Sequence, residues 1–193
     1  MAHTDTIKKL RDATGISVMQ CKQALDEANG DYDTALLILS KKGSAIAAKK
    51  ADRELAAGTV AAYIHSTKEV GAMVLLQSET DFVSKNDEFV ALAYDIAMHI
   101  AAANPQYVKR EDIDEGRTND IKAMFEKEVA DKPDNLKEQI LGGKIDAYLK
   151  GIVLLEQPFI KDQDKTIRDL IENATQKFGE RIEIGRFTRY STR

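Results

Sequence analysis

Apolar side chains recur at helical spacing in three short stretches within the first 43 residues. Polar residues that cap helix starts and glycines that follow helix ends separate these stretches. The caps and stops are Asp5, Gly15, Ser17, Gly30 and Asp31. We expect the third stretch to end at Gly43. Residues 1–43 are therefore predicted to form a three-helix module around one small core.

Residues 44–57 change the pattern, because they are rich in helix formers but lack a broad apolar stripe. This composition predicts a partly exposed connecting helix. Residues 58–65 then alternate Val60, Ala62 and Ile64 with their neighbours, and residues 70–77 form a second stretch rich in residues that favour strands. Only four residues separate the two stretches, which predicts an antiparallel hairpin.

A third alternating stretch covers residues 181–190 near the end of the chain. Phe187 falls in the opposite phase, so we expect a bulge at Gly185. Together with the hairpin, this stretch predicts one antiparallel sheet of three strands.

Helical spacing dominates between the second and third strands. A clean apolar stripe begins after Asn86 or Asp87 and is expected to cover the sheet. Three further helices are predicted between residues 121 and 152, the last two separated by Gly142-Gly143. Thr166 then leads a strongly amphipathic helix.

These patterns predict an α+β chain in three parts. Residues 1–43 form the three-helix module, residues 44–57 the connecting helix, and residues 58–193 a sheet domain covered by helices.

The run 79–86 joins the second strand to the next helix and contains a large ring that the pattern does not explain. Phe82 stands beside Asp81 in a turn, where polar and adaptable side chains are usual. One interpretation is a surface presented to another molecule. The other is a hydrophobic staple, in which Phe82 or Val83 folds back on Phe89. Taken alone, the pattern favours the staple.

Composition and charge narrow the classes of function. With 193 residues, 43% apolar and 31% charged, the chain suits one medium domain and a small module. A net charge of -4 and a pI near 5.5 disfavour binding to nucleic acid. No stretch is apolar and long enough for a membrane span, and no secretory signal opens the chain. We expect a cytoplasmic protein whose partners are proteins.

Residues that carry catalytic or metal chemistry are few. His3, His65 and His99 are scattered, and the single Cys21 excludes an internal disulfide. There is no nucleophile elbow, Walker loop or dinucleotide fingerprint. We predict no catalytic residue, no metal site and no cofactor, although an active site built only from carboxylates stays an alternative.

Several short phrases of the sequence are specific in combination. They are Leu10-Arg11-x-x-Thr14-Gly15, Cys21-Lys22-x-Ala24-Leu25, Asn29-Gly30-Asp31, Thr80-Asp81-Phe82-Val83, Gln157-Pro158-Phe159 and Arg186-Phe187. In this order and spacing they resemble the translation elongation factor Ts family, in its compact form without the inserted coiled-coil hairpin.

The resemblance implies a guanine nucleotide exchange factor rather than an enzyme. Such a protein binds elongation factor Tu carrying GDP and promotes GDP release, so that GTP can enter. By the same resemblance, Phe82 would enter an apolar crevice of the partner, and Asp81 would disturb its magnesium site. Thr80 and Val83 would hold the turn, and Ser84 completes the matched segment.

The resemblance also places the N-terminal module on the same partner, with Arg11, Met19 and Lys22 as contacts. A plainer interpretation makes Met19 a core residue and Lys22 a solvent-facing one, and both stay open. The C-terminal half would reach a separate partner domain or pair with a second copy, giving a homodimer or a two-plus-two complex. The source would be a bacterium or a plastid.

Two other classes of function stay open from the residues alone. The N-terminal module resembles ubiquitin-associated domains, so an adaptor would bind through this part only. An enzyme with carboxylate chemistry would turn over its substrate without any GTPase present. Accelerated nucleotide release is the property that separates the three hypotheses.

Overall fold

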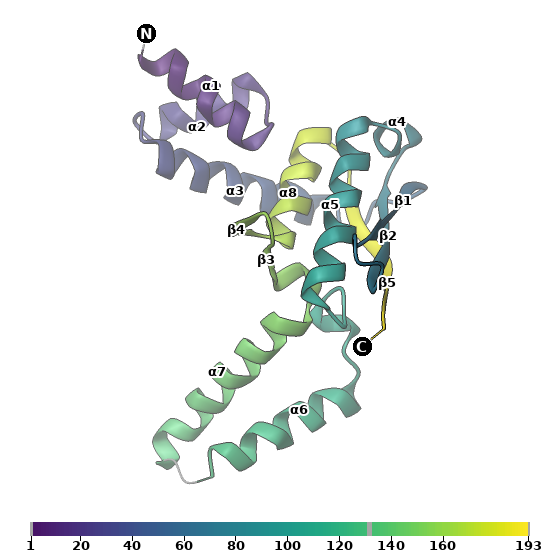
Figure 1. Cartoon of the computed structure of the whole chain (residues 1–193). Coiled ribbons are helices and arrows are strands. Elements are labelled where there is room, and N and C mark those ends of the chain that lie inside the picture. Colours follow the sequence, from purple (N-terminus) through teal and green to yellow (C-terminus); the bar gives the residue numbers. More distant parts are fainter. Residues whose placement is uncertain (1, 131–132, 193) are drawn as a thin grey trace.

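The computed structural model describes residues 2–130 and 133–192, and it shows an α+β fold (Figure 1). An N-terminal helical module and a projecting pair of helices lie at opposite ends, with a small sheet and its covering helices between them (Figure 1). No helix within these ranges has the length and apolar character needed to cross a membrane.

The N-terminal module consists of α1 (Ala2–Thr14), α2 (Val18–Glu27) and the first part of α3 (Tyr32–Lys49). Ser17 and Asp31 cap α2 and α3, as predicted, because each side chain accepts a backbone N–H of the first turn. The helices share a separate core formed by Leu10, Ile16, Cys21, Ala24, Leu25, Ala28, Ala35 and Leu39.

The boundaries of this module differ from the prediction in two places. Asp5 does not cap α1 but lies inside it. Gly43 does not end the third helix, since α3 continues to Lys49 and Gly43 is buried within it. The expected connecting helix is therefore the second part of α3, followed by turns up to residue 56. The division into domains at residues 43 and 58 stays a prediction.

A close helix crossing explains why a glycine stands inside α3. A Cβ on Gly43 would lie 3.1 Å from Gln176 Oε1 of α8 (Ile167–Phe178) and 3.6 Å from the Glu172 carbonyl oxygen. The packing of α3 on α8 therefore outweighs the helix penalty of glycine, which is about 1 kcal/mol relative to alanine.

The predicted antiparallel sheet is present, with strand order β1-β2-β5. The strands are β1 (Ala57–Ile64), β2 (Val70–Ser78) and β5 (Ile182–Ser191). The register between β2 and β5 shifts by one residue opposite Gly185, which confirms the predicted bulge. A side chain there would collide with Gln77, so only glycine fits without rearrangement.

One face of the sheet is covered by α5 (Asp87–Ala103) and α8 (Figure 1). The predicted start of α5 at Asn86 is confirmed, as are the start of α8 at Thr166 and its end at Gly179. The largest fully buried residues of this core are Val74, Leu76, Phe89, Ile96, Ile100, Leu154 and Ile167.

The opposite face of the sheet carries exposed apolar side chains. Val60 and Ile64 of β1 are 61% and 64% exposed, and Met73 of β2 is 47% exposed. Tyr190 of β5, 75% exposed, stands across Gly71 from Ile64. A set of this size on one sheet face is typical of a surface that meets another protein.

The projecting pair consists of α6 (Glu115–Glu128) and α7 (Asp134–Ile152) (Figure 1). One prediction is wrong here, because Gly142-Gly143 does not divide two helices but lies within α7. Exposed glycines cost a helix only about 1 kcal/mol each. Packing of Ile145 and Leu149 beside α6 is enough to keep α7 continuous.

Two helical turns and a small hairpin between α5 and α8 were not predicted. The turns are η1 (Arg110–Asp112) and η2 (Leu154–Glu156). The strands of the hairpin are β3 (Pro158–Phe159) and β4 (Asp162–Thr166). The residues of β4 are mainly polar, so they lack the alternation that marks a half-buried strand.

Candidate partner-binding site

The run after β2 forms a one-turn helix, α4 (Asp81–Ser84), that divides the motif into inner and outer residues. Phe82 is 87% exposed, whereas Val83 and Ser84 are only 8% and 6% exposed. The staple through Phe82 is therefore excluded. Val83 belongs instead to the same core cluster as Phe89, so it anchors the turn while Phe82 points outward.

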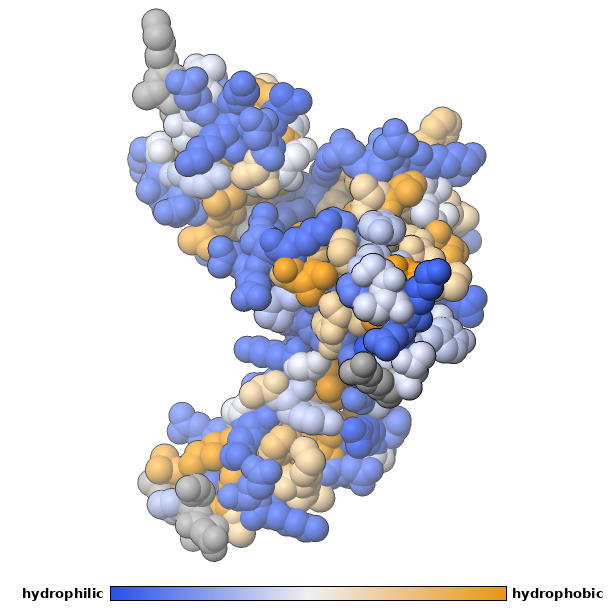
Figure 2. Space-filling view, viewed as in Figure 1, coloured by the Kyte–Doolittle hydropathy of each residue, from blue (hydrophilic) through white to orange (hydrophobic). Residues whose placement is uncertain are grey.

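Side-chain hydrogen bonds hold this turn to the sheet. The Thr59 hydroxyl of β1 donates to the Ser84 carbonyl oxygen at 2.5 Å, and the Ser78 hydroxyl donates to the Thr80 carbonyl oxygen at 3.0 Å. The Glu180 carboxylate accepts the Thr80 N–H at 3.0 Å and its hydroxyl at 2.6 Å. The exposed ring of Phe82 thus belongs to a segment, residues 80–84, whose backbone is bound to the sheet and to Glu180. Figure 2 shows a mainly polar surface around this end of the molecule.

Asp81 lies at the start of α4 with its carboxylate in solvent. Lys85 Nζ lies 2.7 Å from Asp81 Oδ2, and the hydrogen bond and charge of Lys85 hold the pKa of Asp81 below its usual value. Asp81 is therefore ionised at neutral pH. Both side chains are more than half exposed, so this pair is weak and the carboxylate can turn to another cation.

The adjacent Glu79 also helps to hold the turn in place, although it was not among the site residues predicted from the sequence. Its carboxylate accepts the Arg181 N–H at 2.5 Å and lies 3.1 Å from an Arg53 guanidinium nitrogen. Burial alone would raise the pKa of Glu79, but the Arg181 amide and Arg53 together lower it. Glu79 and Glu180 contact partners about 100 residues away, and no local sequence pattern reveals such a pairing.

The three predicted contacts of the N-terminal module lie on its surface. Arg11 is on α1, and Met19 and Lys22 are on α2, all exposed. Met19 is 69% exposed, so the interpretation that placed it in the core is wrong. The neighbouring Val18, 50% exposed, extends this apolar surface and was not predicted. The module and α4 lie toward the same end of the molecule (Figure 1).

Within the described residues, no group of three or more His, Cys, Asp or Glu side chains could hold a metal ion. His65 is exposed, and its Nδ1 lies 2.9 Å from the Tyr63 hydroxyl. The side chain of His3 lies outside the described part of the chain. Cys21 is buried in the core of the module, where burial raises the pKa of its thiol. None of these groups is arranged for nucleophilic chemistry.

His99 of α5 is only 1% exposed and takes part in contacts that hold the fold together. Its Nε2 lies 3.0 Å from Gln157 Oε1, and Gln157 Nε2 donates to the Gly151 carbonyl oxygen of α7 at 2.6 Å. Burial lowers the pKa of His99, so the ring is neutral at pH 7. The pair joins α5 to the base of the projecting hairpin.

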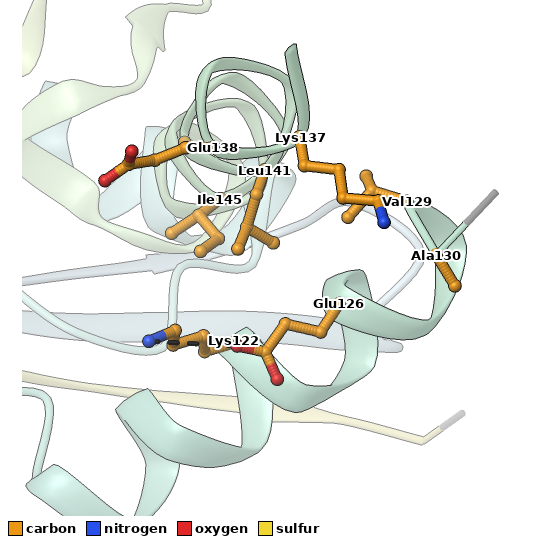
Figure 3. A pocket seen from close by; sticks show the side chains of 9 residues that line it. Lys122, Glu126, Val129, Ala130, Lys137, Glu138, Leu141 and Ile145 are labelled. Carbon is orange, nitrogen blue, oxygen red and sulfur yellow. Dashed lines mark ion pairs between the residues drawn. The ribbon is translucent and has the colours of Figure 1, made fainter. Parts of the chain in front are cut away.

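A hollow of about 550 Å³ opens between α6 and α7. Figure 3 shows Leu141 and Ile145 of α7 pointing toward α6, with Val129 beside them. Lys122 and Glu126 form a 3.7 Å ion pair along the rim (Figure 3). The hollow thus has apolar walls and a charge-balanced rim, without a group prepared for catalysis.

Comparison with known proteins gives a consistent result. A family model described as elongation factor TS matches residues 38–193. A protein named Elongation factor Ts from Thermotoga petrophila is 44% identical over 186 residues, covering 96% of this chain and 94% of the relative. Those named Elongation factor Ts from Alkaliphilus oremlandii and Carboxydothermus hydrogenoformans are 47% and 45% identical. They cover 95% and 98% of this chain, and 86% and 88% of their own lengths.

Proposed function

This chain belongs to the elongation factor Ts family, and on that premise we propose that it is a guanine nucleotide exchange factor for elongation factor Tu. It would bind the GDP form of that partner, disturb the magnesium and phosphate site, and promote GDP release. GTP would then enter during translation elongation. The observation that supports this function is the exposed Phe82 beside the ionised Asp81, on a turn fixed to the sheet.

The exposed ring of Phe82 supplies the anchor. Covering a side chain of this size with apolar groups is worth about 1.5–3 kcal/mol. Its ring has only two side-chain torsions, so little conformational freedom is lost when it is buried. An apolar crevice between helices of the partner's nucleotide domain is the surface that fits.

Asp81 supplies the electrostatic part of the proposal. Because its carboxylate is ionised and only weakly held by Lys85, it can approach a bound divalent ion and reorganise the water around it. GDP is held largely through its phosphates and the magnesium they share. A partner state in which those contacts are strained therefore releases the nucleotide faster.

No covalent step is required for this function. Exchange factor and nucleotide weaken each other's binding reciprocally, and each 1.4 kcal/mol of coupling is worth about a tenfold change in affinity. The N-terminal module would add a second contact through Arg11, Met19 and Lys22, so that α4 meets its target in a fixed orientation. The expected compartment is the cytoplasm, with a plastid as the other compartment in which such a factor would act.

The uncovered sheet face supports a further contact of the C-terminal half. Val60, Ile64, Met73 and Tyr190 would pair with the same face of a second copy, or with another domain of the partner. Two such copies would give a two-plus-two complex. Sedimentation of the intact chain and of Ile64→Lys tests the first arrangement, since a charge in the pair would shift a dimer toward monomer.

The decisive test uses elongation factor Tu preloaded with a fluorescent GDP analogue. Catalytic amounts of the intact chain should accelerate release, and Phe82→Ala should lose most of the acceleration. Met19→Ser should raise the concentration of the chain needed for half-maximal release, with less effect on the maximal rate. The reason is that this substitution removes a docking contact only. Met124→Ala, an exposed apolar residue on the hairpin, is the matched control. No acceleration by the intact chain would contradict the proposal.

A point substitution is preferable to removal of residues 1–43. Because α3 runs unbroken to Lys49, that truncation would cut a helix whose second half packs on α8. An exchange factor has no activity of its own without the GTPase whose nucleotide it releases. Turnover of a substrate by the chain alone would favour the carboxylate enzyme instead.

A further inference from the structure

The turn that carries α4 faces a second turn, between α8 and β5, and each turn binds the other through a carboxylate. Glu180 of the second turn accepts both the N–H and the hydroxyl of Thr80, at 3.0 and 2.6 Å. Glu79 of the first turn accepts the Arg181 N–H at 2.5 Å. We call these four residues, Glu79, Thr80, Glu180 and Arg181, the double clamp.

The geometry of the sheet explains why this arrangement is reciprocal. Ser78 pairs with Ile182 at the end of the antiparallel β2–β5 ladder. Beyond that pair, the backbones of residues 79–80 and 180–181 continue side by side without ladder hydrogen bonds. Two of the amides left over there, those of Thr80 and Arg181, are satisfied by the opposing carboxylates. The ladder is thus extended by side chains up to the first residue of α4.

Thr80 shows that the clamp takes priority over local helix capping. It is the N-cap of α4, with extended backbone angles, yet its side chain makes no capping bond. A threonine in this place usually accepts an N–H of the first turn. Here its hydroxyl donates to Glu180 instead. A four-residue helix without a side-chain cap has little stability of its own, so its direction depends on its tertiary contacts, and the clamp is the one that fixes its first residue.

The clamp also reaches the N-terminal part of the chain. Arg53, which follows α3, lies 3.1 Å from Glu79, and the Arg181 guanidinium donates to the Arg53 carbonyl oxygen. Lys50 at the end of α3 donates to the Gly179 carbonyl oxygen at 2.6 Å. The helix that carries part of the N-terminal module is therefore tied to the same turns that hold α4.

We propose that Glu180 and Glu79 are positioning residues for nucleotide exchange, which fix the direction of the Asp81–Phe82 turn without contacting the partner. This inference rests on the proposed exchange function and assigns roles to residues outside the matched motif. Binding energy gained by Phe82 is then not spent on ordering a loose turn. A fixed turn also brings Asp81 and Phe82 to the partner together.

The test compares Glu180→Ala with Glu183→Ala in the nucleotide-release assay. Glu183 of β5 lies 2.7 Å from the guanidinium of Arg181, which precedes the strand, but its carboxylate binds neither Thr80 nor the Arg181 N–H, which makes it the matched control. Glu180→Ala should lower the maximal release rate on the order of tenfold, since it removes two hydrogen bonds to a charged acceptor. Half-saturating concentration should change little. Glu180→Gln, which keeps one acceptor oxygen, should fall between.

A double mutant separates positioning from general damage. In the Phe82→Ala background, Glu180→Ala should cost less than about twofold, because the ring that the clamp directs is absent. A full and independent loss in that background would overturn the proposal. So would a release rate for Glu180→Ala equal to that of an active intact chain.

Hydrogen exchange of the free chain tests the clamp without the partner. Amides of residues 80–85 should exchange faster in Glu180→Ala than in the intact chain and in Glu183→Ala. Unchanged exchange there would overturn the clamp even if the intact chain were inactive toward the GTPase. Inactivity of the intact chain together with faster amide exchange in Glu180→Ala would contradict the proposed function but support the clamp.

Discussion

The α4 turn and the α6–α7 hairpin both expose apolar side chains, but they are supported differently. Phe82 is 87% exposed on a four-residue helix that reaches the main core through Val83. The helix and its N-cap Thr80 are also bound by three surrounding side chains, those of Thr59, Ser78 and Glu180. Met124 and Leu136 of the hairpin are 44% and 42% exposed on long helices. The hairpin has its own small core, centred on Ile121, Ile152 and Val153.

The difference shows that element length is a poor guide to rigidity. The short α4 is held by contacts to β1, β2 and the turn before β5, whereas the outer part of the hairpin encloses a hollow (Figure 3). Figure 2 shows apolar side chains on the hairpin as well as on the central body. Exposed apolar surface therefore marks a binding site more convincingly where the structure also fixes its direction.

The largest effect on stability is expected for a substitution at Phe89, in the core on which the α4 turn packs. This ring is fully buried in the cluster that contains Val83, and Phe89→Ala should lower the free energy of unfolding by about 3–5 kcal/mol. Denaturant-induced unfolding measures the change. Met124→Ala on the hairpin should stay within about 0.5 kcal/mol. Similar losses for both would remove the contrast between the two regions.

The next effect distinguishes two neighbours within the motif. Val83→Ala removes buried methyl groups and should destabilise the chain by about 1–2 kcal/mol. Phe82→Ala should leave stability within about 0.5 kcal/mol, because the ring is already in solvent. Thermal or denaturant unfolding of the two variants gives the comparison. A marked destabilisation by Phe82→Ala would mean that the ring packs on this chain.

Replacing a glycine of α7 by alanine should increase the stability of the chain, by less than Phe89→Ala and Val83→Ala decrease it. A Cβ at Gly142 or Gly143 would have no heavy atom within 4 Å, and both lie inside α7. Gly142→Ala and Gly143→Ala should each stabilise the helix by about 0.5–1 kcal/mol. Slower amide exchange in α7 measures this gain. Nucleotide release should not change, and a clear loss would show that the hairpin must bend.

The smallest change at neutral pH concerns His99, at the joint between α5 and the base of the hairpin. Its pKa in the folded chain lies below the ordinary value of 6.5, because burial disfavours the charged ring. Between those two values the unfolded chain binds more protons, so stability is complete above about pH 6.5 and falls as the pH drops toward the folded pKa. His99→Gln should show a shallower loss between pH 7.5 and 5.5 in thermal unfolding. Equal slopes would contradict this assignment.

Local patterns predicted the elements that carry their own signals. The bulge at Gly185, the caps Ser17, Asp31 and Thr166, and the stop at Gly179 are all where the sequence placed them. Each depends on the backbone preference of one residue and its immediate neighbours. The sequence also located the segment that contains the candidate site.

Local patterns failed where packing decides against propensity. Glycine at position 43 and the pair at 142–143 are ordinary stop signals, yet α3 and α7 continue through them. Contacts with α8 and α6 supply more free energy than the glycines cost. The strand β4 was missed because a short polar strand has no periodic signal.

The sequence by itself determined the family, the three strands of the main sheet, and the motif in which Phe82 stands. Only the tertiary structure decided that Val83 turns inward, that Phe82 and Met19 turn outward, and that Glu180 and Glu79 hold the turn. The physical reason is distance along the chain. Periodicity and capping act over a few residues, whereas burial and the double clamp depend on segments about 100 residues apart that meet only when β2 pairs with β5.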